Sequence, residues 1–269
     1  MRRRRRSCYN APMRLADKSI VVTGATGIAA AGARKVAREG GKVFVISLNE
    51  DESRSLALEL EVEGGAAGYE TADLTVEAEA DHAFAAADSF LGGIDGLFAV
   101  AGASGRRYGD GPTHEMTLEA WEKTLQANAN PMFLAVRNTI RLIGDSGGSV
   151  VVVSSVLATR PVPSFFATHA YAASKGAANA YVKSLAAHYA KARIRVNAIA
   201  PGLVRTPMSE RAAGDPETVA YATQKQPLAG GFLNAEDIAS AAVFLLSDES
   251  SQITGQVLAV DGGWSVTET

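Results

Sequence analysis

Tyr171 and Lys175 stand four residues apart in the stretch Tyr171-Ala-Ala-Ser-Lys175. If this stretch opens a helix, the spacing places a phenol and an ammonium on one helical face. A tyrosine is a poor base at neutral pH, and lowering its pKa of ~10 by ~3 units requires ~4 kcal/mol. One cation ~4 Å away supplies about that much at an effective dielectric of ~20. The pair therefore predicts a tuned phenol that exchanges protons with a carbonyl or alcohol; the alternative is a solvated helix face.

Two further polar positions favour such chemistry. Ser154 and Ser155 end a β-branched run just before the Tyr171 helix, and a hydroxyl there can hold a substrate carbonyl oxygen or simply form a turn. Asn128 lies inside a helical stretch, where asparagine is a poor helix former, which indicates a specific side-chain or backbone role.

A glycine-rich turn, Gly24-Ala-Thr26-Gly27-Ile28, separates the first predicted strand from a helix. Such a turn lets the backbone approach a pyrophosphate, although it is often only a tight turn. The second strand ends at Ser47-Leu-Asn49, and Ser47 stands where a carboxylate would accept from the ribose hydroxyls of NAD. The missing carboxylate tilts the expectation toward NADP, yet no lysine or arginine stands at that turn. Asp73 follows the third strand and either contacts the adenine or caps a helix.

The elements that position these residues alternate along the whole chain. Short β-branched runs bounded by glycine alternate with longer alanine-rich stretches of helical period, a pattern typical of a parallel sheet covered by helices. No linker or repeat interrupts it. The predicted fold is α/β: a single doubly wound, Rossmann-type domain with a seven-stranded parallel sheet and helices on both faces. Strands are expected at 19–23, 42–47, 68–71, 96–100, 149–154, 194–199 and 256–260, and helices near 27–39, 51–62, 75–91, 117–143, 170–190 and 235–247.

The charge is unevenly distributed, because five of the 26 basic residues form the run from Arg2 to Arg6. The remaining 21 face 29 acidic residues, so the body should repel phosphate backbones, and we expect no nucleic-acid binding by the fold. Residues 1–13 are predicted to be a disordered basic leader and residues 14–269 the domain. The leader lacks the apolar stretch of a secretory signal, and the favoured explanation for it is a start codon placed too early, with Met13 as the true beginning.

Cys8, in the leader, is the only cysteine, which excludes an internal disulfide and a cysteine zinc site in the body. The four histidines have no ligand-like spacing, so no metal is expected. No run approaches the ~18 apolar residues of a membrane-spanning helix. We expect a cytoplasmic protein without membrane contact.

Three stretches together resemble the short-chain dehydrogenase/reductase family. They are Tyr171 to Lys175, the stretch Arg195-Val-Asn-Ala-Ile-Ala-Pro201-Gly202 followed by Thr206, and the closing Ile253-Thr-Gly-Gln-Val-Leu-Ala-Val-Asp-Gly-Gly-Trp264. The likeness runs from about Lys18 to Val266. It implies an NAD(P)-dependent oxidoreductase, a ketoreductase or alcohol dehydrogenase, that transfers hydride between a nicotinamide cofactor and a small-molecule secondary alcohol or ketone. It also implies a homodimer or homotetramer.

The resemblance assigns a catalytic group of Asn128, Ser155, Tyr171 and Lys175. In that family the tyrosine exchanges the proton, the serine orients the substrate, the lysine also holds the nicotinamide ribose and the asparagine supports a water-mediated proton relay. With the residues considered above, the expected cofactor contacts are Gly24, Thr26, Gly27, Ile28, Ser47, Asn49, Asp73, Leu74, Ala101, Gly102, Tyr171, Lys175, Pro201, Gly202, Val204 and Thr206.

The chain departs from the family pattern at three places. The glycine turn is one residue short and carries Ala29 at the last glycine position, so pyrophosphate contact is expected to be looser or reshaped. The usual Asn-Asn-Ala-Gly reads Ala99-Val-Ala-Gly102, which loses side-chain hydrogen bonds that brace the fourth strand. The segment between Ser155 and Tyr171 is longer than is common, which should reshape the substrate side.

The expected substrate loops are 156–170 and 203–232. Their large side chains predict an apolar pocket for a ring-bearing or acyl carbonyl, although loop aromatics often only pack: Phe165, Phe166, Met208, Tyr221 and Phe232. His169 is a further candidate for substrate contact.

The alternative function is a catalytically silent dinucleotide-binding regulatory protein of the same fold, motivated by the altered glycine turn. A sugar-nucleotide epimerase is disfavoured, because little chain follows the sixth strand to form a substrate domain.

Overall fold

Seven parallel strands form one sheet in the computed structural model, which describes residues 13–268. The strand order is β3-β2-β1-β4-β5-β6-β7, so the chain winds outward in two directions from β1 and β4, as the sequence predicts. The strands are β1 (Ser19–Thr23), β2 (Lys42–Ser47), β3 (Ala67–Thr71), β4 (Gly96–Ala99), β5 (Gly148–Val153), β6 (Ile194–Pro201) and β7 (Val257–Val260). The predicted leader lies outside the described residues, apart from Met13.

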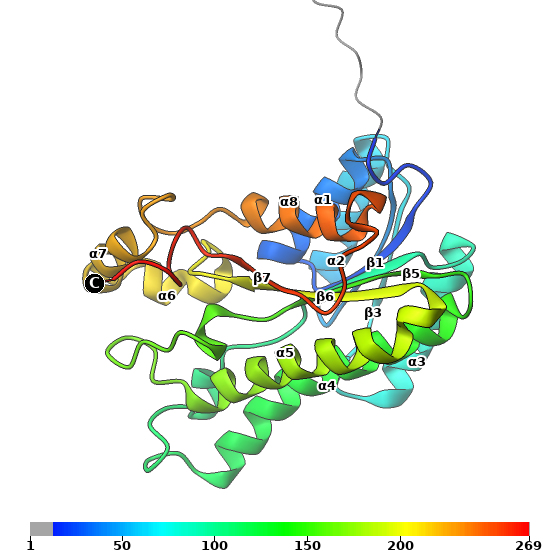
Figure 1. Ribbon diagram of the computed structural model, residues 1–269. Helices are drawn as coiled ribbons and strands as arrows, with labels where there is room; N and C mark the ends of the chain where they lie inside the picture. Colours follow the sequence, from blue (N-terminus) through cyan, green and yellow to red (C-terminus); the bar gives the residue numbers. More distant parts are fainter. Residues whose placement is uncertain (1–12, 269) are drawn as a thin grey trace, which may run out of the picture.

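Helices cover both faces of the sheet (Figure 1). On one face lie α1 (Gly27–Arg38), α2 (Glu50–Val62) and α8 (Ala235–Leu246); on the other lie α3 (Glu77–Leu91), α4 (Leu118–Ile143) and α5 (His169–Tyr189). Central strands such as β1 are buried along their whole length, because each of their sides packs on a helix layer. The two layers enclose separate apolar cores, one centred on α1 and α8 and the other on α3, α4 and α5.

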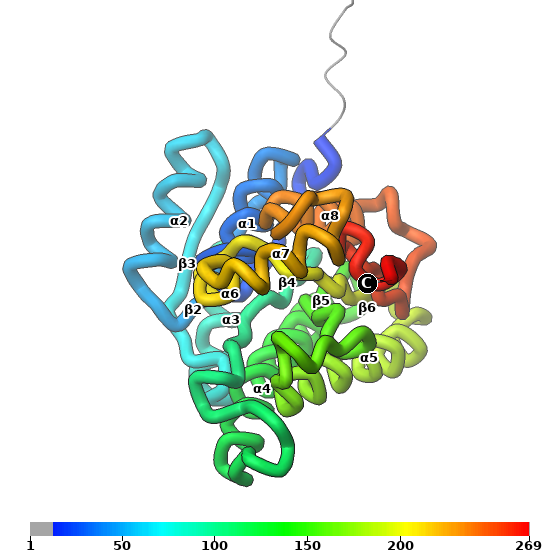
Figure 2. Tube along the Cα trace, turned by 90° about the vertical axis from the view of Figure 1, so that its left-hand side faces the viewer, coloured from blue at the N-terminus to red at the C-terminus, as the bar shows by residue number. Residues whose placement is uncertain are grey.

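The remaining elements are short, and several gather at the carboxyl ends of the strands (Figure 2). They are η1 (Gly105–Tyr108), η2 (Val156–Ala158), η3 (Ala190–Ala192), η4 (Pro207–Ser209), α6 (Glu210–Ala213), α7 (Pro216–Lys225) and η5 (Asp248–Ser250). Residues 203–232, expected as a loop, contain α6 and α7. A signal for α7 was present: Asp215 caps the helix by accepting from the backbone N–H of Thr218, and Pro216 occupies its first turn.

Thr23 explains why β4 ends at Ala99, one residue before the predicted limit. Its hydroxyl oxygen accepts from the backbone N–H groups of Val100, at 3.0 Å, and Ala101, at 3.1 Å. The chain thereby leaves the sheet with its donors satisfied. A side chain of β1 thus braces the turn that lacks the family's asparagines.

A close approach between α1 and β4 makes Gly32 a test of this packing. A Cβ at Gly32 would lie 2.4 Å from the ring of Phe98, which is fully buried. We expect Gly32→Ala to lower the free energy of unfolding by about 1–3 kcal/mol, because the overlap displaces a core ring. Denaturant unfolding checks this against Gly176→Ala in α5, where a Cβ meets nothing within 4 Å. Equal stability of the two variants would contradict the prediction.

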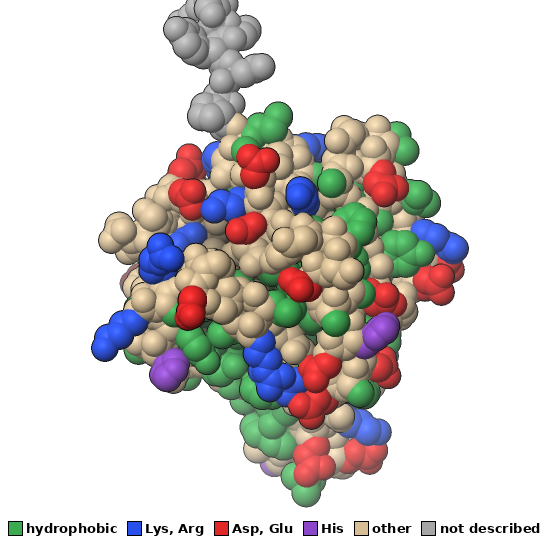
Figure 3. All heavy atoms as spheres, turned by 90° about the vertical axis from the view of Figure 1, so that its right-hand side faces the viewer, with side chains coloured by type: hydrophobic (Ala, Val, Ile, Leu, Met, Phe, Trp, Pro, Cys, Tyr) green, Lys and Arg blue, Asp and Glu red, His purple; other side chains and the backbone are tan. Residues whose placement is uncertain are grey.

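Figure 3 shows the face turned toward the right of Figure 1, where acidic and basic side chains are interspersed. None of the helices among residues 13–268 is both long and apolar enough to cross a bilayer. The same residues hold no group of three or more His, Cys, Asp or Glu side chains placed to bind a metal ion.

Candidate active site

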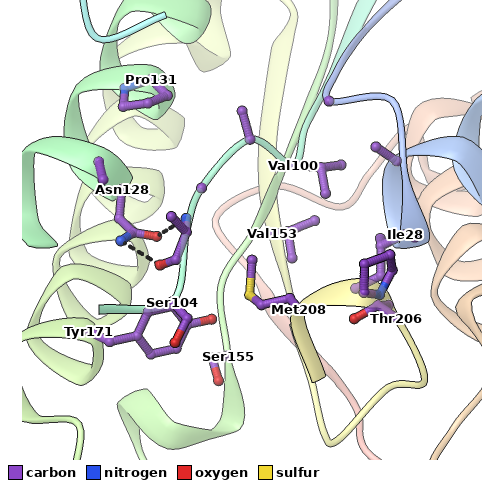
Figure 4. Close-up of a pocket in the computed structure, with 18 of the residues that line it drawn as sticks. Ile28, Val100, Ser104, Asn128, Pro131, Val153, Ser155, Tyr171, Thr206 and Met208 are labelled. Carbon is purple, nitrogen blue, oxygen red and sulfur yellow. Dashed lines mark hydrogen bonds between the residues drawn. The ribbon is translucent and has the colours of Figure 1, made fainter. Parts of the chain in front are cut away.

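A cavity of about 680 Å³ opens at the carboxyl ends of the strands. Parallel sheets of this topology bind ligands at this edge, because loops and helix N-termini converge there. All four predicted catalytic residues line the cavity, as do all the predicted cofactor contacts with the exception of Asn49. Figure 4 shows Asn128 and Tyr171 on one side of it and Ile28 and Thr206 on the other.

The glycine turn after β1 forms one wall. Gly27 has φ +53°, a conformation that favours glycine, and a Cβ there would lie 3.0 Å from the side chain of Thr206. Helix α1 begins at Gly27, and its N-cap residue Thr26 makes no side-chain capping bond. The first backbone N–H groups of a helix lack intrahelical partners, so this turn fits an anionic group such as a pyrophosphate.

Ala29 accounts for the shortened glycine motif. Its methyl group is buried and lies 3.1 Å from the position that a Cβ on Gly24 would take. The alanine therefore packs against the turn at Gly24, and Gly24, Gly27 and Ala29 all line the cavity.

Asn49 is placed differently from the sequence expectation. Its side chain accepts from the backbone N–H of Glu52 and caps α2, while Leu48 and Glu52 line the cavity beside Ser47. The sequence Asn49-Glu-Asp-Glu52 indicates this capping role, because asparagine followed by acidic residues is typical of a helix N-terminus. Glu52, which was not among the predicted site residues, brings a carboxylate to this end.

Asp73 lines the same end, beside Leu74. Its carboxylate accepts from the backbone N–H of Thr75 at 2.8 Å, and the residue that caps α3 is Val76. The proposed N-cap role is therefore not observed, and Asp73 instead forms a local turn at the cavity wall.

Tyr171, Lys175 and Ser155 come together at the opposite end. Tyr171 and Lys175 lie one turn apart in α5, and the Lys175 ammonium is 5.6 Å from the centre of the Tyr171 ring. Lys175 is 7 % exposed, and its Nζ donates to the carbonyl oxygen of Val153 at 2.9 Å. Ser155 follows β5, caps η2 and hydrogen-bonds with the Tyr171 phenol. The end of β5 and the first turns of α5 thus bring Ser155, Tyr171 and Lys175 together in one cluster.

Burial dominates the electrostatics of this cluster. It raises the pKa of Tyr171 to about 12, against a smaller lowering by the Ser155 hydrogen bond. It lowers the pKa of Lys175 to about 8. The expectation that the ammonium makes the phenol acidic is therefore not met in this structure, because desolvation opposes the phenolate and the ammonium is directed to Val153. At neutral pH the pair consists of a protonated phenol and an ammonium.

Asn128 is buried in α4 and hydrogen-bonds to the loop after β4. Its Nδ2 donates to the carbonyl oxygens of Ala103 and Thr124, at 3.0 and 2.9 Å, and its Oδ1 accepts from the N–H of Ala103 (Figure 4). A Cβ at Gly102 would lie 2.7 Å from this Oδ1, so only glycine permits the approach. The predicted backbone role of Asn128 is observed.

Asp110 anchors the helix that carries Tyr171, and sequence analysis did not identify it. Its buried carboxylate accepts from the backbone N–H groups of Ala170 and Tyr171, both at 2.9 Å. The nominal N-cap residue Thr168 makes no capping bond. A carboxylate at a helix N-terminus satisfies its free donors and its dipole. Because Asp110 is 60 residues away in sequence from Ala170, no local pattern could reveal this contact.

Large apolar side chains line the substrate end, but its aromatic residues differ from those expected. Phe166 and Met208 line the cavity, and so does Trp264. Phe165 and Tyr221 pack against each other, with ring centres 4.9 Å apart, behind that wall. Phe232 is buried in a small cluster with α6 and α7, and His169 hydrogen-bonds to Thr113. Neither of these two residues lines the cavity.

The segment after β6 closes the cavity between its two ends. Pro201, Gly202, Val204 and Thr206 all line it, as expected. The side chain of Gln226, the C-cap residue of α7, holds the start of this segment, because its Oε1 accepts from the N–H of Leu203 and its Nε2 donates to the carbonyl oxygen of Leu203.

Comparisons with known proteins agree with this geometry. The family model described as enoyl-(acyl carrier protein) reductase matches residues 22–265. The 2,5-dichloro-2,5-cyclohexadiene-1,4-diol dehydrogenase LinX of Sphingobium indicum is 34% identical over 255 residues, which cover 94% of this chain and 98% of the relative.

Two solved structures are similar over nearly their whole length. A short-chain type dehydrogenase/reductase from Mycobacterium ulcerans has a TM-score of 0.87 at 31% identity, with 94% of this chain and 92% of that chain covered. A putative NAD(P) dependent gluconate 5-dehydrogenase from Beutenbergia cavernae, with bound NADP at low occupancy, has a TM-score of 0.87 at 32% identity, with 96% and 100% covered. The chain therefore belongs to the short-chain dehydrogenase/reductase family, and it is an NAD(P)-dependent oxidoreductase of alcohols.

Proposed function

We propose that the protein transfers hydride between a nicotinamide cofactor and a secondary alcohol or ketone, with Tyr171 as general acid/base. The observation that carries this proposal is a single cavity with a glycine turn at the N-terminus of α1 on one side and the Tyr171, Ser155 and Lys175 cluster on the other. A catalytically silent regulator has no need for that cluster.

The residues present fit a dinucleotide. The Gly24 to Ile28 turn would hold the pyrophosphate, Ser47, Asp73 and Leu74 the adenosine, and Lys175 the nicotinamide ribose. The segment from Pro201 to Thr206 would hold the carboxamide side, with Ala101 and Gly102 beneath. When bound, the nicotinamide supplies or accepts the hydride.

The chain's own residues handle the proton. The phenol of Tyr171, protonated at neutral pH, donates to the carbonyl oxygen of a ketone, while the Ser155 hydroxyl orients that oxygen. The ammonium of Lys175 stabilises the phenolate that forms on Tyr171. Asn128 holds the loop at Gly102 that lies under the reacting end. A phenol that is protonated at neutral pH is in the state that reduction of a ketone requires.

The substrate we propose is ring-bearing or otherwise apolar around its carbonyl. Phe166, Met208 and Trp264 supply that wall. The relative from Sphingobium indicum is described as acting on a cyclohexadienediol, a ring that carries hydroxyl groups, which supports the same class here.

A ketone panel tests the function directly. Purified protein with NADH or NADPH is expected to oxidise the cofactor when ring-bearing ketones are added. Cofactor binding with no turnover across a broad panel would favour the regulatory alternative.

The choice between NAD and NADP depends on the charges at the adenosine end of the cavity. The absence of a carboxylate at Ser47 favours NADP, but Glu52 lines this end and begins α2 together with Glu50 and Asp51. A 2′-phosphate would meet like charge there. We therefore propose a preference for NAD over NADP, and we expect Glu52→Gln to raise kcat/KM for NADPH relative to NADH by roughly 3- to 10-fold.

Glu50→Gln is the matched control, because Glu50 is in the same helical turn but does not line the cavity. Steady-state kinetics with both cofactors checks this prediction. A wild-type preference for NADPH that Glu52→Gln leaves unchanged would contradict it. The homodimer or homotetramer and the cytoplasmic location remain predictions.

A further inference from the structure

The lining of the cavity is polarised in charge. Its carboxylates, Glu52 and Asp73, lie at the ends of β2 and β3. Its arginines lie at the other end: Arg106 and Arg107 in η1, and Arg211 in α6. In a body with an excess of acidic residues, three arginines at one mouth require an explanation.

No carboxylate within residues 13–268 forms an ion pair with Arg106, Arg107 or Arg211, whereas arginines elsewhere in the fold, such as Arg14, Arg34 and Arg137, do form such pairs. Figure 3 shows the opposite edge of the sheet, where charges of both signs are interspersed. The cationic mouth is therefore not a general feature of the surface.

Arg106 and Arg211 also act on each other. Burial and the nearby charge of Arg211 lower the pKa of Arg106, against a smaller rise caused by the Asp110 carboxylate, so the two guanidinium groups repel across the mouth. One Nη2 of Arg106 donates to the carbonyl oxygen of Phe165 at 2.8 Å, which fixes the side chain beside the substrate loop and leaves its other donors available. An oxyanion between two such groups would replace repulsion with charge-assisted hydrogen bonds.

The cavity that holds both these arginines and the Tyr171 cluster also has large apolar side chains in its lining: Val156, Leu157, Phe166, Met208 and Trp264. We propose that Arg106 and Arg211 form a subsite for an oxyanion at the far end of an apolar substrate, so that the natural substrate is an oxo or hydroxy compound bearing a carboxylate or phosphate. This proposal rests on the proposed function, because it specifies the substrate of the same cavity.

Binding can be tested without turnover. Calorimetry on the cofactor-loaded enzyme compares 3-phenylpropionate, 2-phenylethylphosphonate and the neutral 3-phenylpropionamide. We expect at least one anion to bind about tenfold or more tightly than the amide, and the better anion distinguishes carboxylate from phosphate. The preference should shrink as salt is raised.

Variants assign the effect to the two arginines. Arg106→Gln with Arg211→Gln should abolish the preference and leave the affinity of the amide unchanged, while Arg106→Lys should retain most of it. Arg205→Gln is the matched control, because Arg205 is exposed, lies over the Phe232 ring and does not line the cavity. Its preference should equal that of the wild type.

Three outcomes would overturn the subsite. The first is equal affinity for anion and amide in the wild type. The second is a preference that survives in the double variant. The third is a loss of NADH affinity in the double variant, which would assign the arginines to the cofactor. Failure of the proposed function has a different readout, because it shows as absent turnover across the ketone panel whatever the calorimetry gives.

Discussion

Tyr171→Phe is expected to lower kcat for ketone reduction by roughly 10²- to 10⁴-fold while cofactor affinity changes by less than about threefold. The substitution removes the one hydroxyl that hydrogen-bonds with Ser155 at the reacting end and keeps the ring that packs in α5. No neighbouring group can replace the proton, because Lys175 donates to Val153 and Ser155 is a far weaker acid. Stopped-flow kinetics and cofactor titration by fluorescence measure the two quantities separately.

Tyr221→Phe is the control for this variant, because Tyr221 packs on Trp264 and does not line the cavity. It should retain the wild-type rate. If Tyr171→Phe kept a rate within tenfold of the wild type, the acid/base assignment would be wrong.

The second large effect is a dependence of reduction on pH. Burial lowers the pKa of Lys175 to about 8 and raises that of Tyr171 to about 12. Below pH 8 both groups carry the protons that reduction needs, and the phenol keeps its proton throughout the accessible range. As pH rises through about 8 the ammonium becomes an amine and no longer stabilises the phenolate, so kcat/KM should fall by up to about tenfold per pH unit.

Lys175→Arg separates this ionisation from others. A guanidinium stays charged throughout this range, so the fall near pH 8 should disappear even if the absolute rate is lower. Initial rates between pH 6 and 10 in a constant ionic strength buffer provide the measurement. A wild-type profile that stays level to pH 10 would refute the role given to the Lys175 charge.

The sheet and its helices could be predicted because their signals are local. The buried strands read as continuous β-branched runs, and the helices carry periodic alanine and leucine. The residues after the strands could be placed together for the same reason, since the carboxyl ends of parallel strands share one edge.

Other features of the site could not be predicted, because they depend on burial and on contacts between residues that are distant in the sequence. The phenol was expected to be acidic because the sequence shows a nearby charge and not the desolvation that outweighs it. Asp110 and Trp264 reach the site from segments about 60 and 90 residues away from Tyr171. Asn49 is a different case, because its capping role was visible in the acidic run that follows it.

Asp110 connects the loop that carries Arg106 to the helix that carries Tyr171. This loop begins with Gly105, includes Arg106 and ends at Asp110. The Asp110 carboxylate accepts hydrogen bonds from the backbone of the first turn of α5. Gly105 is required beneath it, since a Cβ there would lie 2.4 Å from the Asp110 carboxylate. An exchange of this loop that is meant to change substrate specificity must therefore retain Gly105 and Asp110. Without them, α5 would lose the contact that positions Tyr171, the proton donor.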